Sequence, residues 1–143
     1  MIWFTEFTPE QLNNRPKNHL GGLLDIQFTE IGEDWVTATM PVDERTHQPA
    51  GILHGGASVV LAETLGSIAS YMCIDPESSQ AVGLEINANH LRPVKSGKVT
   101  GICKSIHKGA KTHVWEIRIY DDRGKMNCIS RLTVAIIPRI PAA

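Results

Sequence analysis

Apolar side chains recur at helical spacing from Ala57 through Leu65 to Met72. The positions between them are mostly small or apolar as well, so almost the whole circumference of such a helix can be covered. This pattern is typical of a helix inside a fold, and a single carboxylate, Glu63, interrupts it. We therefore predict a buried helix that carries one acidic side chain and follows a Pro/Gly-rich loop.

Elsewhere apolar and polar residues alternate, which is the pattern of half-buried strands. Two such runs precede the helix, at 22–31 and 35–40, and a turn joins them as a hairpin. Thr8 and Pro9 match the start of a short N-terminal helix that ends before Pro16. Four more strands are predicted after the long helix, at 82–88, 99–106, 114–120 and 126–137.

The order of these elements is a hairpin, a long helix and a meander of strands. It predicts an α+β fold in which one curved antiparallel sheet wraps the central helix. The outer face of the helix and the edge strands then remain for a partner. With 143 residues, 42% of them hydrophobic, and no repeat or linker, we expect one domain over 1–143.

Composition narrows the class of protein. A net charge of −1 without blocks of like charge gives no support for a nucleic-acid partner or a polybasic membrane contact. No apolar run reaches membrane-spanning length, and the first residues lack the features of a signal peptide. The three cysteines have no CxxC spacing, so we expect reduced, mostly buried thiols in a cytoplasmic protein.

Four candidate functional residues cluster around the start of the long helix: Gln48, His54, Gly55 and Glu63. The first turn of a helix has backbone N–H groups without an intrahelical partner and carries positive partial charge. Gly55 lets a carbonyl oxygen approach these donors closely, because no side chain intervenes. An N–H group aimed at an oxygen that becomes negative forms an oxyanion hole, and Glu63 can attack the carbonyl carbon or activate a water.

Distance restricts how these groups can cooperate. Gly55 and Glu63 are separated by eight positions, which places their backbones about 12 Å apart along one helix. One reacting carbon has to lie near both groups, and a glutamate side chain closes only part of that gap. Two antiparallel helices in a symmetric dimer bring Gly55 of one chain beside Glu63 of the other. We therefore expect an active site at a subunit interface.

Each of these residues also has a plainer interpretation. The His-Gly-Gly sequence alone can be a tight turn with His54 bonded locally, and Glu63 alone can pair with a lysine or arginine. Gln48 alone can be an ordinary loop residue. We favour a site because the residues occur together around a buried helix. A metal site from His47, His54 and Glu63 matches no zinc spacing, so no metal is expected.

Residues 45–49, 53–56, 62–64 and 83–90 have the sequences RTHQP, LHGG, AET and GLEINANH. Nearly the whole chain resembles the hotdog-fold acyl-CoA thioesterases, above all the bacterial branch of menaquinone and enterobactin biosynthesis. The resemblance implies a hotdog fold and hydrolysis of acyl-CoA with aromatic acyl groups of the 1,4-dihydroxy-2-naphthoyl or hydroxybenzoyl type. It also implies a homodimer as the minimal unit, a homotetramer as a dimer of dimers, and no cofactor beyond the CoA of the substrate.

The resemblance also implies roles for single residues. Glu63 is similar to the family's catalytic carboxylate, which acts as nucleophile or general base. The Gly55 amide is similar to its oxyanion donor, supported by His54 and Gln48. The positions that match substrate-binding segments of the family are Thr64 and Ser67 in the acyl pocket, and Gly83, His90, Leu91, Arg92, Pro93, His107, Lys108, Gly109, Ala110, Lys111 and Thr112 around CoA.

Positive charge at Arg92, Lys108 and Lys111 suits the phosphates of CoA, although each residue is also common on an ordinary surface. Ala110 and Lys111 stand where relatives often have serine and arginine, and Thr64 where serine is common. We therefore expect a different hold on the nucleotide and a narrower acyl pocket.

Two other functions are compatible with the resemblance. A hotdog dehydratase or hydratase acts on acyl thioesters as well, but through differently spaced motifs that this sequence lacks. A non-catalytic acyl-CoA-binding protein is disfavoured by the joint presence of Glu63, Gln48 and His54. The identity of the acyl group, and the choice between CoA and acyl carrier protein as its carrier, stay open.

Overall fold

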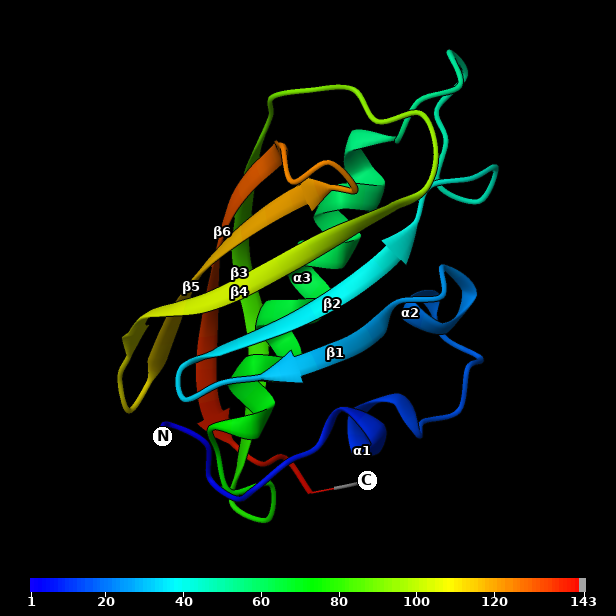
Figure 1. The fold of residues 1–143 in the computed structure, drawn as a ribbon. Helices are drawn as coiled ribbons and strands as arrows, with labels where there is room; N and C mark the ends of the chain where they lie inside the picture. The colour runs from blue at the N-terminus through cyan, green and yellow to red at the C-terminus, as the bar shows by residue number, and fades with distance from the viewer. Residues whose placement is uncertain (142–143) are drawn as a thin grey trace.

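The computed structural model describes residues 1–141, which fold around one long helix (Figure 1). The N-terminal helix α1 is confirmed, with a capping box at Thr8. The strands predicted after the long helix are also confirmed, and each extends beyond one or both of its expected ends. The elements are α1 (Pro9–Asn13), α2 (Leu20–Leu23), β1 (Gln27–Ile31), β2 (Trp35–Pro41), α3 (Gly55–Met72), β3 (Ser79–His90), β4 (Lys98–Lys108), β5 (Thr112–Asp121) and β6 (Met126–Pro138).

The six strands form one antiparallel sheet in the order β1-β2-β4-β5-β6-β3. Figure 1 shows this sheet curving around α3, while the N-terminal segment with α1 and α2 lies beside the β1 end. The predicted α+β architecture, a curved antiparallel sheet around a central helix, is thus confirmed.

The helix lies very close to the sheet. Its inner face, with Leu61 and Leu65 fully buried, packs on the concave side of the sheet. A Cβ on Gly101 of β4 would lie 2.6 Å from Leu65 Cδ1, and a Cβ on Gly66 would collide with Leu132. Because interiors are close-packed, neither glycine can be enlarged without displacing a buried leucine side chain. None of the helices within residues 1–141 is long and apolar enough to cross a membrane.

Within one chain the helix is not covered on all sides. A stripe that contains Val60, Glu63, Thr64 and Ser67 is only half-buried, and Tyr71 at its end is exposed. The all-round burial suggested by the apolar pattern is therefore incomplete in a single chain.

The strand predicted at 22–31 is wrong over its first half. Residues 20–23 form α2, and the imidazole of His19 caps it by accepting the Gly22 N–H at 3.2 Å. Asp25 then adopts a left-handed backbone with φ of 52°, and β1 begins only after it. The apolar alternation continues through this turn, because its apolar side chains pack on the core as those of a strand would.

Strand β3 forms a free edge of the sheet. It pairs with β6 alone, and Leu84 is an extra residue that bulges out of register after Gly83. Val82 is 40% exposed and Leu84 is 64% exposed. A long edge with apolar side chains is a surface that proteins normally cover, so β3 is the part of the sheet most suited to a second chain.

Candidate active site

The first turn of α3 leaves one backbone donor free. The His54 carbonyl accepts the N–H groups of Ala57 and Ser58 at 2.9 and 3.3 Å, and its Nδ1 accepts the Gly56 N–H at 2.8 Å. No acceptor for the Gly55 N–H is found within residues 1–141. His54 therefore caps the helix, and the free N–H is that of the glycine singled out in the sequence.

The free donor lies at a cavity of about 350 Å³. Gly55 lies against the imidazole of His90, whose Nε2 would be 2.7 Å from a Cβ on this glycine. The structure thus brings residues that are far apart in the sequence to one place at the start of α3. Of the predicted site residues, this cavity is lined by Gln48, Gly55, His90, Leu91, Arg92 and Pro93.

Gln48 is held in place by its own loop. Its N–H donates to the Ile52 carbonyl at 2.8 Å, and Gly51 makes the tight turn between them with φ of 77°. The Ala50 N–H donates to the Gln48 side-chain oxygen, which orients the amide. The Nε2 group is then left as a donor for a carbonyl oxygen at the cavity.

Glu63 lies against β3 rather than beside Gly55. A Cβ on Gly83 would lie 2.5 Å from Glu63 Oε1, so this carboxylate occupies the space that a larger residue would fill. The position is next to the bulge at Leu84, and bulges often re-aim side chains near active sites. The predicted binding residue Gly83 thus supports the carboxylate directly.

Substituting Gly83→Ala should therefore displace the Glu63 carboxylate. We expect kcat to fall roughly tenfold to a hundredfold, because a displacement of about 1 Å at a reacting group can cost a hundredfold in rate. The melting temperature should change little, since Gly83 has no positive φ that alanine could not adopt. Steady-state kinetics beside thermal unfolding checks this. In a Glu63→Gln background the same substitution should have almost no further effect on kcat, and a full further loss would contradict the contact.

A second cavity, of about 580 Å³, lies along the half-buried stripe of α3. Glu63, Thr64 and Ser67 line it from the helix, as the acyl-pocket prediction requires, together with Ile68. Burial raises the pKa of Glu63 above its ordinary value of 4.5, because partial desolvation disfavours the charged form. This site combines an apolar space with a carboxylate of increased basicity.

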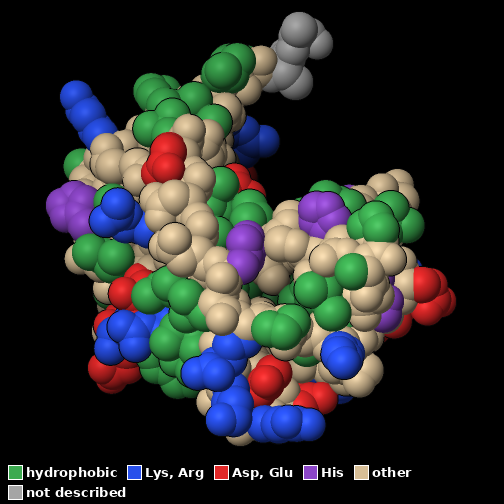
Figure 2. Space-filling model, turned by 90° about the horizontal axis from the view of Figure 1, so that it is seen from above, with side chains coloured by type: hydrophobic (Ala, Val, Ile, Leu, Met, Phe, Trp, Pro, Cys, Tyr) green, Lys and Arg blue, Asp and Glu red, His purple; other side chains and the backbone are tan. Residues whose placement is uncertain are grey.

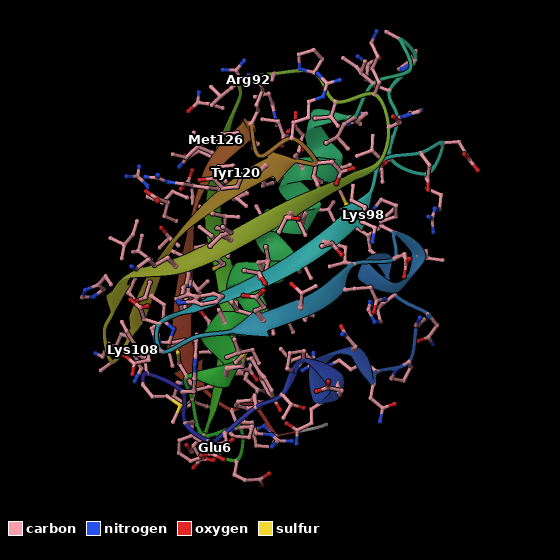
Figure 3. The ribbon with its side chains drawn as sticks, viewed as in Figure 1. Glu6, Arg92, Lys98, Lys108, Tyr120 and Met126 are labelled. Atoms are coloured by element: carbon pink, nitrogen blue, oxygen red, sulfur yellow. The ribbon has the colours of Figure 1, made fainter. Side chains whose placement is uncertain are left out.

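The two cavities do not share a lining residue, so one chain does not bring Gly55 and Glu63 together. The third group of predicted residues, at 107–112, covers the end of β4, the turn and the start of β5, and it lines neither cavity. Figure 3 shows Lys108 and Arg92 at opposite ends of the sheet. The predicted site is thus divided into three parts within a single chain.

Sequence reasoning missed several residues of these cavities. Ser58 and Asn127 line the first, and Arg15 and His19 line the second. The side-chain oxygen of Asn127 is buried without a hydrogen-bond partner inside 1–141. Asn127 lies in a strand, whereas Arg15 and His19 lie in a polar loop, and neither setting carries a sequence signal of a site.

Viewed from above, the surface is hollowed between two lobes, with hydrophobic and histidine side chains around the hollow (Figure 2).

Fold and site together define a class of protein. A family model described as the Thioesterase superfamily matches residues 50–128. This range includes β3 and the whole of α3, and therefore the residues of α3 that line the two cavities. The chain belongs to this superfamily, it has the hotdog fold, and it is a thioesterase.

Particular relatives are similar over almost the whole chain. The 1,4-dihydroxy-2-naphthoyl-CoA hydrolase of Escherichia coli K12 is 53% identical over 96% of this chain and 100% of its own. The proofreading thioesterase EntH of Cronobacter turicensis is 48% identical over 96% of this chain and 99% of its own. A crystal structure of a mutant thioesterase from Pseudomonas aeruginosa superposes with a TM-score of 0.95 at 54% identity, covering 97% of this chain and 100% of the other.

Proposed function

We propose that this thioesterase hydrolyses aromatic acyl-CoA, and that each active site combines Glu63 of one subunit with the Gly55 amide of its partner. The observation that carries the proposal is the division of these two groups between separate cavities in one chain. The name of the Escherichia coli relative supports an aromatic acyl group of the 1,4-dihydroxy-2-naphthoyl type, and hence a place in menaquinone biosynthesis.

The free edge of β3 supports the dimer. Pairing of two β3 strands about a twofold axis continues the sheet, covers Val82 and Leu84, and places the two α3 helices antiparallel. Glu63 contacts Gly83, near the middle of β3, so both carboxylates lie close to such an axis. An antiparallel neighbour then presents its helix start toward the cavity of Glu63.

In this arrangement the carbonyl oxygen of the thioester accepts the Gly55 N–H and the Gln48 amide. Glu63 then takes a proton from water, whose oxygen attacks the carbonyl carbon, or attacks that carbon itself and forms an anhydride that water cleaves. The negative charge that develops on the carbonyl oxygen is held by the Gly55 N–H, and its collapse breaks the C–S bond. CoA leaves as a thiolate that takes up a proton, so no strong general acid is needed.

The CoA arm fits the first cavity, where His90, Leu91 and Pro93 line a channel and Arg92 offers a cation for a phosphate. Lys108 lies at the opposite end of the sheet from Arg92 (Figure 3), and Lys111 lies in the turn that follows it between β4 and β5. We propose that they contribute to a site on a neighbouring subunit, as a tetramer built from two dimers allows. We further propose one domain over 1–143, no cofactor, a cytoplasmic location, and acyl carrier protein as an alternative carrier of the acyl group.

A panel of aryl- and alkyl-CoA thioesters with a thiol-trapping dye tests the proposal. Aromatic thioesters should release CoA with the highest kcat/KM. Hydration of crotonyl-CoA without CoA release would instead favour a dehydratase or hydratase, and tight binding without release would favour a binding protein. Size measurement in solution should give a dimer or a tetramer, and a monomer with full activity would contradict the shared site.

The pH profile should show an acid limb set by Glu63. Burial raises the pKa of this carboxyl, and only its ionised form can act as base or nucleophile. We therefore expect kcat/KM to fall as pH decreases, with a midpoint above 4.5. Measuring kcat/KM between about pH 4 and pH 8 checks this, because the range extends from ordinary carboxyl pKa values to strongly raised ones. The limb should be absent from the residual activity of Glu63→Gln, and a limb that persists there unchanged would assign it to another group.

A further inference from the structure

The cavity beside Glu63 has a second wall that the proposed reaction does not use. Opposite the helical residues, the segment at 15–21 closes the cavity with Arg15, Pro16, Leu20 and Gly21, and with the imidazole of His19. The catalytic carboxylate and two basic side chains therefore share one largely apolar space of about 580 Å³. A space of this size holds a ring system with its substituents.

The hydrogen bond made by His19 determines which tautomer its neutral ring adopts. Nδ1 accepts the Gly22 N–H at 3.2 Å, so the neutral ring carries its proton on Nε2. No partner for Nε2 is found within residues 1–141. The ring lies beside Gly21, where a Cβ would be 3.5 Å from its Cε1 and 3.9 Å from the Thr64 methyl group. A free N–H donor is thus held at the wall, close to the helix residue that follows Glu63.

Arg15 is the second donor at this wall. Its guanidinium lies over the Tyr71 ring, 5.6 Å from the centroid, where a cation–π contact holds it. It makes no ion pair with a carboxylate in the part of the chain that the structure describes. Both side chains are exposed in a single chain, and the protein uses neither donor in an ion pair or hydrogen bond within residues 1–141, so both are available to a bound ligand.

We propose that His19 and Arg15 determine specificity for the acyl group, and that they select acyl groups with an oxygen substituent, a phenolic hydroxyl or phenolate, remote from the thioester. This inference rests on the proposed function, because it places the acyl group in the cavity of Glu63. An acyl ring that enters the cavity displaces water from these exposed donors, and a substrate oxygen replaces that water whereas an unsubstituted ring does not. Sites built to hydrogen-bond a hydroxyl discriminate strongly against analogues that lack it, whereas apolar pockets discriminate weakly.

His19 also has a purely structural role as a helix cap. One substitution distinguishes this role from recognition of the acyl group. His19→Ser keeps an effective N-cap, since serine is among the preferred residues at that position, but it removes the ring and its Nε2 donor. Arg15→Met removes the charge and retains much of the length of the side chain. The matched control is Arg118→Met, because Arg118 is ion-paired with Glu116 on the exposed face of β5, away from both cavities.

The experiment compares kcat/KM for benzoyl-CoA with kcat/KM for 2-, 3- and 4-hydroxybenzoyl-CoA in each protein. We expect the wild type to prefer at least one hydroxylated substrate by about tenfold or more. His19→Ser and Arg15→Met should each reduce this preference severalfold, because kcat/KM for the hydroxylated substrate falls more than kcat/KM for benzoyl-CoA. Arg118→Met should retain the preference. Loss of a cap alone would lower the melting temperature and affect all substrates alike, so the ratio distinguishes recognition from capping.

Two outcomes overturn the inference while the proposed function stands: a wild type that hydrolyses all four thioesters equally, or a His19→Ser protein with an unchanged preference. Absence of CoA release from every thioester in the wild type would instead overturn the proposed function, and this inference with it.

Discussion

Glu63→Gln is expected to lower kcat by about two to four orders of magnitude, the usual contribution of a positioned base, while acyl-CoA still binds. The substitution keeps the shape of the side chain and its contact with Gly83, but glutamine cannot accept a proton or attack a carbonyl carbon. CoA release at saturating substrate measures kcat, and competition with a fluorescent CoA analogue measures binding. Glu77→Gln is the matched control, because Glu77 is an exposed carboxylate paired with Arg139 outside both cavities.

The same variant should be more stable than the wild type at neutral pH. The pKa of Glu63 is raised in the folded state, so the folded protein holds this proton more tightly than the unfolded chain does. The free energy of unfolding therefore falls as pH rises from the unfolded pKa through the folded one, and the cost is complete above both. The stability difference between Glu63→Gln and the wild type should vanish in acid.

In the kinetic experiment, near-normal turnover of Glu63→Gln would remove this residue from the mechanism.

Gly55→Pro is expected to abolish most activity, because the ring carbon of proline replaces the backbone N–H and occupies its place. Proline is well tolerated at the first position of a helix, and the extended backbone of His54, with φ of −67° and ψ of 130°, suits a residue before proline. Gly55→Ala is the matched control, since its Cβ meets His90 in the same way but the N–H remains. We expect kcat of the proline variant to be about a hundredfold to a thousandfold below that of the alanine variant. Equal rates for the two variants would exclude the Gly55 N–H as the oxyanion donor.

Mixing the two defects tests whether the site is shared. A heterodimer of Glu63→Gln and Gly55→Pro chains has one site with both defects and one with neither, if each site takes one group from each chain. Random assembly from coexpressed chains should then restore about a quarter of the wild-type activity. If both groups of a site come from one chain, every site carries one defect and no activity returns.

Much of the fold could be predicted because its signals are local. The apolar circumference between Ala57 and Met72 identifies α3, and strict alternation identifies the long strands. The failure at 22–31 is also local in origin, since a capping histidine and a left-handed aspartate interrupt an alternation that continues around them. A pattern of apolar residues says which side chains are buried, and only secondarily which backbone presents them.

The candidate site was predictable where a motif carries it and not where the tertiary structure creates it. The HGG sequence identifies the helix start, with Gly55 and its cap His54. Contact between Glu63 and Gly83 depends on a bulge and on long-range pairing of β3 with β6, which have no sequence signature. The sequence assigns no role to His19, because only the folded chain brings its ring to the end of α2 and to the wall of the cavity.

The glycines that press α3 onto the sheet restrict how this enzyme can acquire new substrates. Because Gly66 and Gly101 leave no space on the inner side, a library of variants directed at that side should yield mostly misfolded proteins. Residues 15–20 are exposed, and the segment they belong to bounds the cavity where the acyl group is proposed to bind. Directed evolution toward other acids should therefore begin in this loop, whose residues can change in size and polarity without disturbing the packed centre.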